Sequence, residues 1–355
     1  VVYCGYQINA GTRNEEPGEE GLAHFCEHVT FKGTERRKAW HILNCLESVG
    51  GDLNAYTNKE GTVYYSAILK EHIARAVDLL SDIVFHSVYP QAEIDKEVEV
   101  ICDEIESYND SPAELIYDEF ENILFKGSPL GHNILGTAEQ VRAFKTEDAL
   151  RFTQKLYRPD NAIFFAYGDI DFKKLVKLIG KALTDDSSGK LAEKGCHADF
   201  ADDADFSGET GDTGFAGARD SEITQMSQAP QMTQISRGAI DSMGSMDPMG
   251  SPAGQTIVMQ KNTHQAHVMI GTRAYDVNDD RRMPLYLLNN MLGGPGMNAK
   301  LNLALREHNG LVYTVESTMV SYGDTGTWSI YFGCDEHDVK RCLRLVRKEL
   351  DKFMQ

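Results

Sequence analysis

The sequence predicts an α+β protein of two related domains, in which helices pack against antiparallel sheets. Runs that alternate like strands are interspersed with segments of helical periodicity over residues 1–185, and the same mixture resumes over residues 255–355. The chain has 355 residues, of which 41% are hydrophobic, and this is enough for about two domains with real cores.

The first domain, residues 1–185, is expected to open with a strand over residues 1–10 and a turn-rich loop. A helix follows from about Leu22 to Lys32, and Gly33 is its stop signal. A second helix is expected in "RRKAWHILNCLESV" and a hairpin in "DLNAYTNKEGTVYYSAIL". Further helices are expected at about 70–88, 91–109, 111–125 and 145–157, followed by a buried strand in "NAIFFAYGDI" and a helix in "DFKKLVKLIGKAL".

Residues 186–254 have a different composition. Gly, Ser, Asp, Met and Gln dominate, periodicity is absent, and 12 acidic residues against 4 basic ones give the segment a net charge of −8. Such a composition predicts a linker or a disorder-prone insert. We favour a flexible tether between the domains. The alternative is a pseudo-substrate, in which "TQMSQAPQMTQIS" lies along a strand edge near Tyr56.

The second domain, residues 255–355, begins with two strand-like runs in "TIVMQKNTHQAHVMIGTRAY". Helices are expected in "MPLYLLNNML" and "AKLNLALREHN", a hairpin in "LVYTVESTMVSYGDTGTWSIYFGC" and a final helix from about His337. This order of strand, two helices, hairpin and helix resembles the first domain. It suggests an internal duplication, although no repeat of individual residues is visible.

Charge and composition exclude some classes of function. The net charge of −19 argues against nucleic acid as a partner, because its phosphates would be repelled; the charge would suit cationic peptides or metal ions, but solubility alone explains it. No apolar run is long enough to span a membrane. Seven cysteines at irregular spacing, without a CxxC pair, predict reduced and mostly buried thiols. The compartment stays unknown, with a reducing one such as the cytoplasm favoured over the periplasm.

The stretch "EEGLAHFCEHVTFKGT" carries the first candidate site. His24 and His28 are four residues apart, so in a helix they lie one above the other and both can reach one zinc ion at ~2.0–2.1 Å. Glu27 lies on the same face, where a carboxylate can deprotonate a zinc-bound water without binding the metal. The pattern His-x-x-Glu-His is the reversed form of a common zinc-protease motif. The alternative is two core or surface histidines on an ordinary helix.

A third protein ligand is expected on the helix predicted from "EIDKEVEVICDEIESYND". Glu97 and Glu104 are seven residues apart, which is two helical turns, and they share one face of a helix that is otherwise largely apolar. The alternative is a solvated acidic face, which is our interpretation of Glu93, Glu99 and Glu106. A catalytic zinc site needs three protein ligands and one water molecule.

With these motifs, the chain resembles the M16 metallopeptidases, the pitrilysin or inverzincin family, of the short two-domain type related to mitochondrial processing peptidase subunits. The segment "GLAHFCEHVTFKGT" is similar to the family's inverted zinc helix, and "GGDLNAYTNKEGTVYY" to the edge strand that pairs with extended substrate. Two further landmarks match in "SPLGHNILGT" and "YRPDNAIFFAYGDID", and "LGGPGMNAKLNLALREHNGLVYTV" resembles the segment that carries an Arg and a Tyr. The resemblance covers nearly the whole chain apart from residues 186–254.

The resemblance implies a half-clamshell fold and a role for each residue of the metal site. His24, His28 and Glu104 would bind Zn²⁺. Glu27 would be the general base, and Glu97 would orient one of the ligands.

The resemblance also implies contacts with substrate and with a partner chain. Arg306 and Tyr313 would stabilise the oxyanion and hold the substrate backbone. An extended peptide would add to the edge strand at Asn54, Ala55 and Tyr56. The active unit is expected to be a homodimer, or a heterodimer with a related chain, in which Arg306 and Tyr313 complete the partner's site.

Taken together, these implications predict a zinc-dependent endopeptidase that hydrolyses short or unfolded peptides in a closed chamber. The alternative is a non-catalytic structural or partner subunit of a larger complex, and a metal-storage module is a weaker third. Structural subunits of the family usually lack a ligand or the base, whereas all the motif residues are present here, so the enzyme is favoured. Compared with the family, the chain is expected to begin within a strand and to stop after about half of the second domain.

Overall fold

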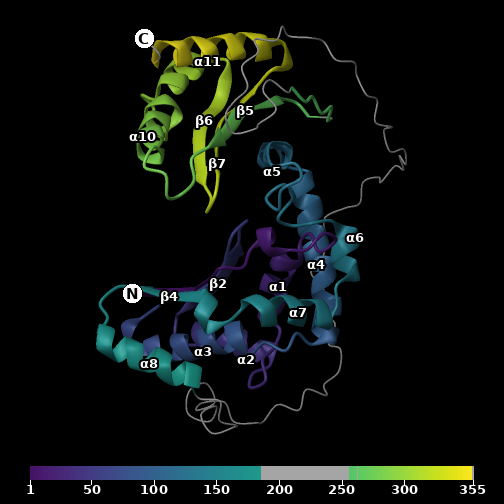
Figure 1. Ribbon diagram of the computed structural model, residues 1–355, viewed down its shortest axis with the longest axis vertical. Helices are drawn as coiled ribbons and strands as arrows, with labels where there is room; N and C mark the ends of the chain where they lie inside the picture. The colour runs from purple at the N-terminus through teal and green to yellow at the C-terminus, as the bar shows by residue number, and fades with distance from the viewer. Residues whose placement is uncertain (185–255, 262, 354–355) are drawn as a thin grey trace, which may run out of the picture. The chain divides into compact units, whose positions relative to one another are not determined.

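The computed structural model of the protein describes residues 1–184, 256–261 and 263–353 (Figure 1). The first region is residues 1–184, and the second region comprises residues 256–261 and 263–353. The tether and pseudo-substrate hypotheses fall on residues 186–254, which lie outside the described residues. The first region and the described residues from Val258 onward belong to one compact unit, so a boundary between two domains stays a prediction.

The first region is built on four strands: β1 (Val2–Ile8), β2 (Asp52–Thr57), β3 (Thr62–Ile68) and β4 (Ala162–Tyr167). They form one antiparallel sheet in the order β2–β3–β1–β4. Side chains alternate between its two faces, and one face meets the helices. On β1, for example, Val2 and Ile8 are fully buried, whereas Tyr3 is 51% exposed.

The helices of the first region follow the predicted pattern closely. They are α1 (Leu22–Thr30), α2 (Ala39–Glu47), α3 (Ile73–Phe85), α4 (Gln91–Asn109), α5 (Pro112–Leu124), α6 (Ala138–Ala143), α7 (Thr146–Leu156) and α8 (Phe172–Thr184), with 3₁₀ turns η1 (Thr12–Asn14), η2 (Lys70–His72) and η3 (Pro159–Asn161). The bounds of α4 are those that the sequence predicts. Helix α6 is not predicted, because its 6 residues are too few to show helical periodicity.

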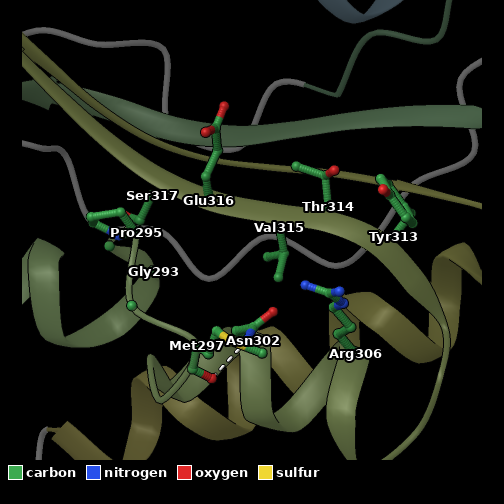
Figure 2. A pocket seen from close by; sticks show the side chains of 12 residues that line it. Gly293, Pro295, Met297, Asn302, Arg306, Tyr313, Thr314, Val315, Glu316 and Ser317 are labelled. Carbon is green, nitrogen blue, oxygen red and sulfur yellow. Dashed lines mark hydrogen bonds between the residues drawn. The ribbon is translucent and has the colours of Figure 1, made fainter.

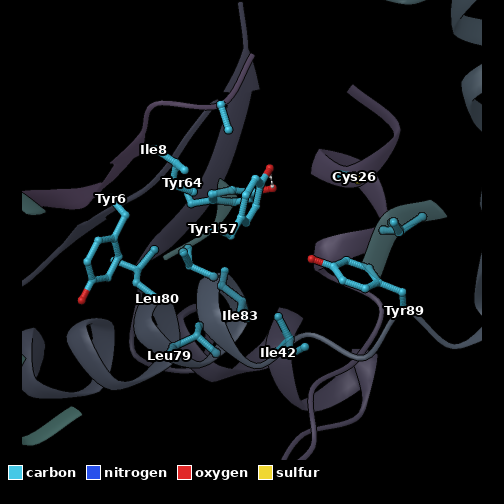
Figure 3. Packing of buried hydrophobic residues seen from close by; sticks show 14 of the residues in the cluster. Tyr6, Ile8, Cys26, Ile42, Tyr64, Leu79, Leu80, Ile83, Tyr89 and Tyr157 are labelled. Atoms are coloured by element: carbon cyan, nitrogen blue, oxygen red, sulfur yellow. Dashed lines mark hydrogen bonds between the residues drawn. The ribbon is translucent and has the colours of Figure 1, made fainter. Parts of the chain in front are cut away.

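The core of the first region lies between the sheet and the helices on one of its faces (Figure 3). Helix α3 packs on β1 and β3, while α1 packs on β2, α4 and α7. Tyr64 of β3 is fully buried at the centre, and its hydroxyl group lies 3.1 Å from Oγ1 of Thr30 and 3.2 Å from the hydroxyl group of Tyr157. This packing brings together the segments that carry the predicted zinc ligands and the predicted substrate strand.

The second region contains the strands β5 (Ala266–Ala274), β6 (Val312–Ser321) and β7 (Gly326–Cys334), which form an antiparallel sheet in the order β5–β7–β6. Its helices are α10 (Arg282–Gly293), the π-helical η4 (Asn302–Glu307), the 3₁₀ turn η5 (Glu336–Asp338) and α11 (Val339–Phe353). The prediction of two strand-like runs is wrong for the first run, because residues 256–261 have no regular secondary structure. Val258 is 87% exposed, so this apolar run packs against no core.

The order of elements in the first region recurs in the second (Figure 1). The series β1, α1, β2, β3 and α3 corresponds to the series β5, α10, β6, β7 and α11. In each sheet the third strand of the series lies between the first and the second, as β3 does between β1 and β2 and β7 does between β5 and β6. The topology thus supports the internal duplication, and the predicted α+β class with antiparallel sheets is confirmed.

Two predictions from composition can be compared with the described residues. Within these ranges no helix combines the length and the apolar character that crossing a membrane requires. Free, buried thiols are found at Cys4, Cys26, Cys102, Cys334 and Cys342.

Candidate metal centre

Helix α1 presents two different faces. Leu22, Phe25 and Val29 are fully buried in the core of the first region, and they fix the rotation of the helix about its axis. His24 and His28, four residues apart, share another face, and their ring centroids are 4.7 Å apart. This face meets α4 and β2.

Helix α4 places two carboxylates opposite the histidines. The Oε2 atom of Glu104 lies 3.2 Å from Nε2 of His28 and 3.7 Å from Nε2 of His24. Two turns earlier on the same face, Oε1 of Glu97 lies 3.1 Å from Nδ1 of His28. The other oxygen of Glu97 lies 2.5 Å from Nζ of Lys32. Because His28 uses Nδ1 for Glu97, its Nε2 is available to a metal ion.

The geometry of this cluster fits a zinc ion. The ligand atoms of His24, His28 and Glu104 lie within 4.8 Å of one another. Two imidazole nitrogens and one carboxylate oxygen form the donor set of a catalytic zinc site, which keeps its fourth position for water or substrate. Among the described residues, one further group has comparable spacing, but it is the largely exposed turn at residues 335–338.

The electrostatics of the cluster favour a bound cation. Burial, together with the charge of His28, lowers the pKa of His24 to about 4, so this imidazole is neutral. Burial also opposes charge on His28, but hydrogen bonds to Glu104 and Glu97 outweigh it and raise the pKa of His28 to about 9. The hydrogen bond with His28 lowers the pKa of Glu104 in turn. The two carboxylates therefore stabilise positive charge at this site, whether a proton or a metal ion carries it.

Glu27 lies beside the histidines on α1. Burial raises the pKa of its carboxyl group, and a hydrogen bond with Thr57, the last residue of β2, partly offsets this effect. The Oε2 atom of Glu27 is buried and has no hydrogen-bond partner among the described residues. An unpartnered buried oxygen is energetically costly, so this atom is suited to accept a proton from a water molecule in the site.

Among the described strands β2 pairs with β3 alone, so the predicted substrate strand is at the end of this sheet. Asn54 and Tyr56 are exposed, and Ala55 between them is half-buried, as expected for alternating faces. The side-chain oxygen of Asn54 accepts a hydrogen bond from the Ala55 N–H at 2.8 Å. Thr57, the last residue of β2, interacts with Glu27, so the end of this strand lies beside the metal cluster.

Arg306 and Tyr313 lie together in the second region (Figure 2). The guanidinium carbon of Arg306 is 5.8 Å from the ring centroid of Tyr313. Both residues line a pocket of about 350 Å³ along β6, with residues 293–297 and Asn302 among its other walls. Arg306 belongs to the π-helical η4, and π-helical turns are frequent at functional sites. The 81% exposed Tyr313 is accessible to another molecule.

Two residues of the site are missing from the sequence predictions. Lys32 forms an ion pair with Glu97. Helix α1 ends at Thr30, so Lys32 lies in the turn that follows it, and the spacing of four residues from His28 is the signal that could have found it. Thr57 contacts Glu27, but no local pattern indicates this contact, because it depends on how β2 packs against α1.

Comparison with known families matches almost the whole chain. The model of a family described as Insulinase (Peptidase family M16) matches residues 1–138. The model of a second, described as Peptidase M16 inactive domain, matches residues 143–209 and 245–355.

Individual relatives agree with these matches. An uncharacterized zinc protease from Rickettsia bellii is 32% identical over 97% of this chain and 71% of its own length. The uncharacterized zinc protease YmxG of Bacillus subtilis is 29% identical over 98% of this chain and 72% of its own length. An uncharacterized zinc protease from Streptomyces coelicolor is also 29% identical, and the chain spans 66% of that protein.

Two solved structures have a similar fold. The crystal structure of a peptidase M16 inactive domain from Pseudomonas fluorescens aligns with a TM-score of 0.74 at 16% identity, over 99% of this chain and 73% of that one. The crystal structure of a protease from Helicobacter pylori aligns with a TM-score of 0.74 at 20% identity, over 98% of this chain and 74% of that one. At these identities the likeness concerns the fold.

Proposed function

The chain belongs to the M16 peptidase family, and from that premise we propose that it is a zinc-dependent endopeptidase that hydrolyses short or unfolded peptides. The observation that carries this proposal is the cluster of His24, His28 and Glu104, whose ligand atoms lie within 4.8 Å of one another. The buried, unpartnered oxygen of Glu27 beside this cluster supports it further. The name zinc protease, which the curated relatives carry, agrees with this proposal.

Five residues have a role in the proposed metal site. His24, His28 and Glu104 would hold one zinc ion, which when bound polarises the scissile carbonyl group and lowers the pKa of a water molecule. Glu97 fixes the ring of His28 through Nδ1, so that Nε2 faces the site. Lys32 holds the carboxylate of Glu97 by an ion pair at 2.5 Å.

Glu27 is the proposed general base and, later, the general acid. Its unpartnered Oε2 accepts a proton from the attacking water molecule and delivers it to the amide nitrogen as the peptide bond breaks. Burial raises the pKa of Glu27, and a higher pKa makes the carboxylate a stronger base than an exposed one.

The proposed substrate-binding mode is strand addition to the outer edge of β2, the side that faces away from β3. Backbone hydrogen bonds to the stretch Asn54–Tyr56 would hold an extended peptide, so preference for its side chains would be broad. The contact between Thr57 and Glu27 supports this mode, because it joins the end of β2 to the proposed base.

Arg306 and Tyr313 are proposed to act on the oxyanion and on the substrate backbone. Their mutual proximity and the exposure of Tyr313 support a shared role. We further propose that the active unit is a dimer, in which this pair completes the site of the partner chain inside a closed chamber.

The test compares zinc content and peptide hydrolysis in wild type and His28→Ala. We expect about one zinc ion per wild-type chain, hydrolysis of unfolded reporter peptides, and loss of both in the variant. His337→Ala, in the exposed turn at residues 335–338, is the matched control and should keep both. Full zinc occupancy in His28→Ala would contradict the ligand assignment. Zinc binding by wild type without hydrolysis of any reporter peptide would favour the non-catalytic subunit.

A further inference from the structure

The loop Ser128–Thr137, here named the clamp loop, is one of the landmarks in the sequence, and the proposed mechanism gives it no task. It packs against the start of α1. We propose that His132 of the clamp loop and its partner Glu15 are positioning residues, which hold the first turn of α1 and thereby the zinc ligand His24. This inference rests on the proposed function and assigns no chemistry to either residue.

The N-terminus of α1 is capped from outside the helix. Its N-cap residue is Gly21, which has no side chain and a positive φ of 95°. The carboxylate of Glu15 takes the place of a capping side chain: Oε2 accepts the Gly21 N–H at 3.1 Å, and Oε1 accepts the Ala23 N–H at 2.7 Å. A negative charge at this end of a helix is also favoured by the helix dipole.

The clamp loop explains why the cap is remote. A Cβ atom on Gly21 would lie 2.6 Å from the carbonyl oxygen of Leu135, so no serine or aspartate fits at the N-cap. A Cβ atom on Gly136 would collide with the carbonyl group of Glu20, and Gly136 also has a positive φ of 67°. Backbone therefore lies directly against backbone at this point, and the capping carboxylate has to come from another segment.

Glu15 is held by His132. The side chain of Glu15 is 1% exposed, and burial raises its pKa, although hydrogen bonds from His132 and the helix amides lower it. Nε2 of His132 lies 2.8 Å from Oε2 of Glu15. A buried carboxylate is costly unless donors surround it, and here His132 and two backbone N–H groups converge on it.

The clamp loop also holds the turn that follows the substrate strand. The ammonium group of Lys59, in the turn between β2 and β3, donates a hydrogen bond to the carbonyl oxygen of His132. Lys59 is 3% exposed, so this contact lies inside the protein. His132 thus makes two contacts. Its side chain contacts Glu15, which caps α1, and its backbone carbonyl group contacts Lys59 in the hairpin of β2 and β3.

The two histidines depend on this arrangement to different degrees. Nδ1 of His28 is held by Glu97, whereas Nδ1 of His24 is buried without a hydrogen-bond partner among the described residues. The ring of His24 is therefore oriented mainly by the backbone of the first helical turn, in which it is the third residue. We therefore expect a shift of this turn to displace His24 more than His28.

The test measures the zinc dissociation constant, by competition with a chromophoric chelator, in wild type, Glu15→Gln and His132→Ala. Glutamine at position 15 keeps one acceptor oxygen but replaces the other by an NH₂ donor. This donor would face N–H groups, with which it cannot form a hydrogen bond. We expect zinc affinity to fall roughly 10- to 100-fold in both variants, as it does when supporting partners of metal ligands are removed. His132→Gln, which keeps an N–H donor, should recover part of the loss. Glu16→Gln, at an exposed neighbouring carboxylate, is the control and should bind as wild type does.

Two further measurements separate positioning from general stability. Thermal unfolding of the zinc-free proteins shows whether His132→Ala is folded, and kcat should fall in that variant while KM stays within about twofold. Amide hydrogen exchange of residues 21–25 in zinc-free protein should accelerate in Glu15→Gln. Unchanged zinc affinity in folded variants would overturn the inference. If wild type bound no zinc, the proposed function would fail. The positioning role of Glu15 and His132 would still be tested by hydrogen exchange, and unchanged exchange of the amides of residues 21–25 would contradict it.

Discussion

Replacing Lys32 by methionine should weaken zinc binding although Lys32 touches no zinc ligand. Methionine keeps the aliphatic stem and removes the ammonium group, whose nitrogen lies 2.5 Å from Oε2 of Glu97. The two side chains are only 25% and 13% exposed, so water replaces the lost partner incompletely. A hydrogen bond to a charged group contributes about 1.5–3 kcal/mol. If the hydrogen bond from Lys32 keeps Glu97 in contact with His28, losing this hydrogen bond should raise the zinc dissociation constant roughly 10- to 100-fold.

Chelator competition measures this change directly. The matched control is Lys96→Met on α4, whose ion pair with Glu93 at 2.8 Å is solvent-exposed, with 70% of the lysine side chain accessible. Exposed pairs contribute little, so this control should bind zinc within about twofold of wild type. Equal zinc affinity in Lys32→Met and Lys96→Met would refute the idea that Lys32 supports the metal site through Glu97.

Three further predictions concern substrate, partner and core. Proline at the residues that flank the cut should abolish cleavage of a good peptide, because proline cannot donate a strand hydrogen bond; unaffected cleavage would exclude strand addition. Mixing Glu27→Gln chains with Tyr313→Phe chains should restore part of the activity, and verified mixed dimers without rescue would place both groups in one chain's site. Tyr64→Phe should lower the free energy of unfolding by about 1–2 kcal/mol, since the buried hydroxyl contacts Thr30 and Tyr157. Tyr167→Phe, 79% exposed, is the control for denaturant unfolding and should leave stability unchanged.

The predicted elements are most accurate where the pattern is local and long. Helix α4 is predicted with its bounds because helical periodicity over 19 residues is incompatible with a strand or a loop. The strand-like run at residues 256–261 fails for the opposite reason: alternation over a few residues makes a strand only where a sheet and a core accept it, and Val258 is 87% exposed. The sequence predicts a helix at η4, but no sequence pattern predicts its π-helical geometry.

In the candidate site, too, residues close together in the sequence are predictable, whereas contacts between distant segments are not. His24, Glu27 and His28 are predictable because they share one helical face. The support around them joins residues far apart in the sequence: Glu97 is 69 residues from His28, and His132 is 117 residues from Glu15. Such pairs follow from tertiary packing, so spacing along the chain cannot identify them without a family resemblance or a structure.

In the proposed mechanism Glu27 moves the proton and does not bind the metal, and the variant Glu27→Gln separates these two roles. Glutamine has nearly the same shape but cannot accept the proton. The variant should bind zinc as wild type does, measured by elemental analysis, while hydrolysis of a reporter peptide should fall by roughly 100-fold or more. Hydrolysis at the wild-type rate, or loss of zinc from the folded variant, would contradict it.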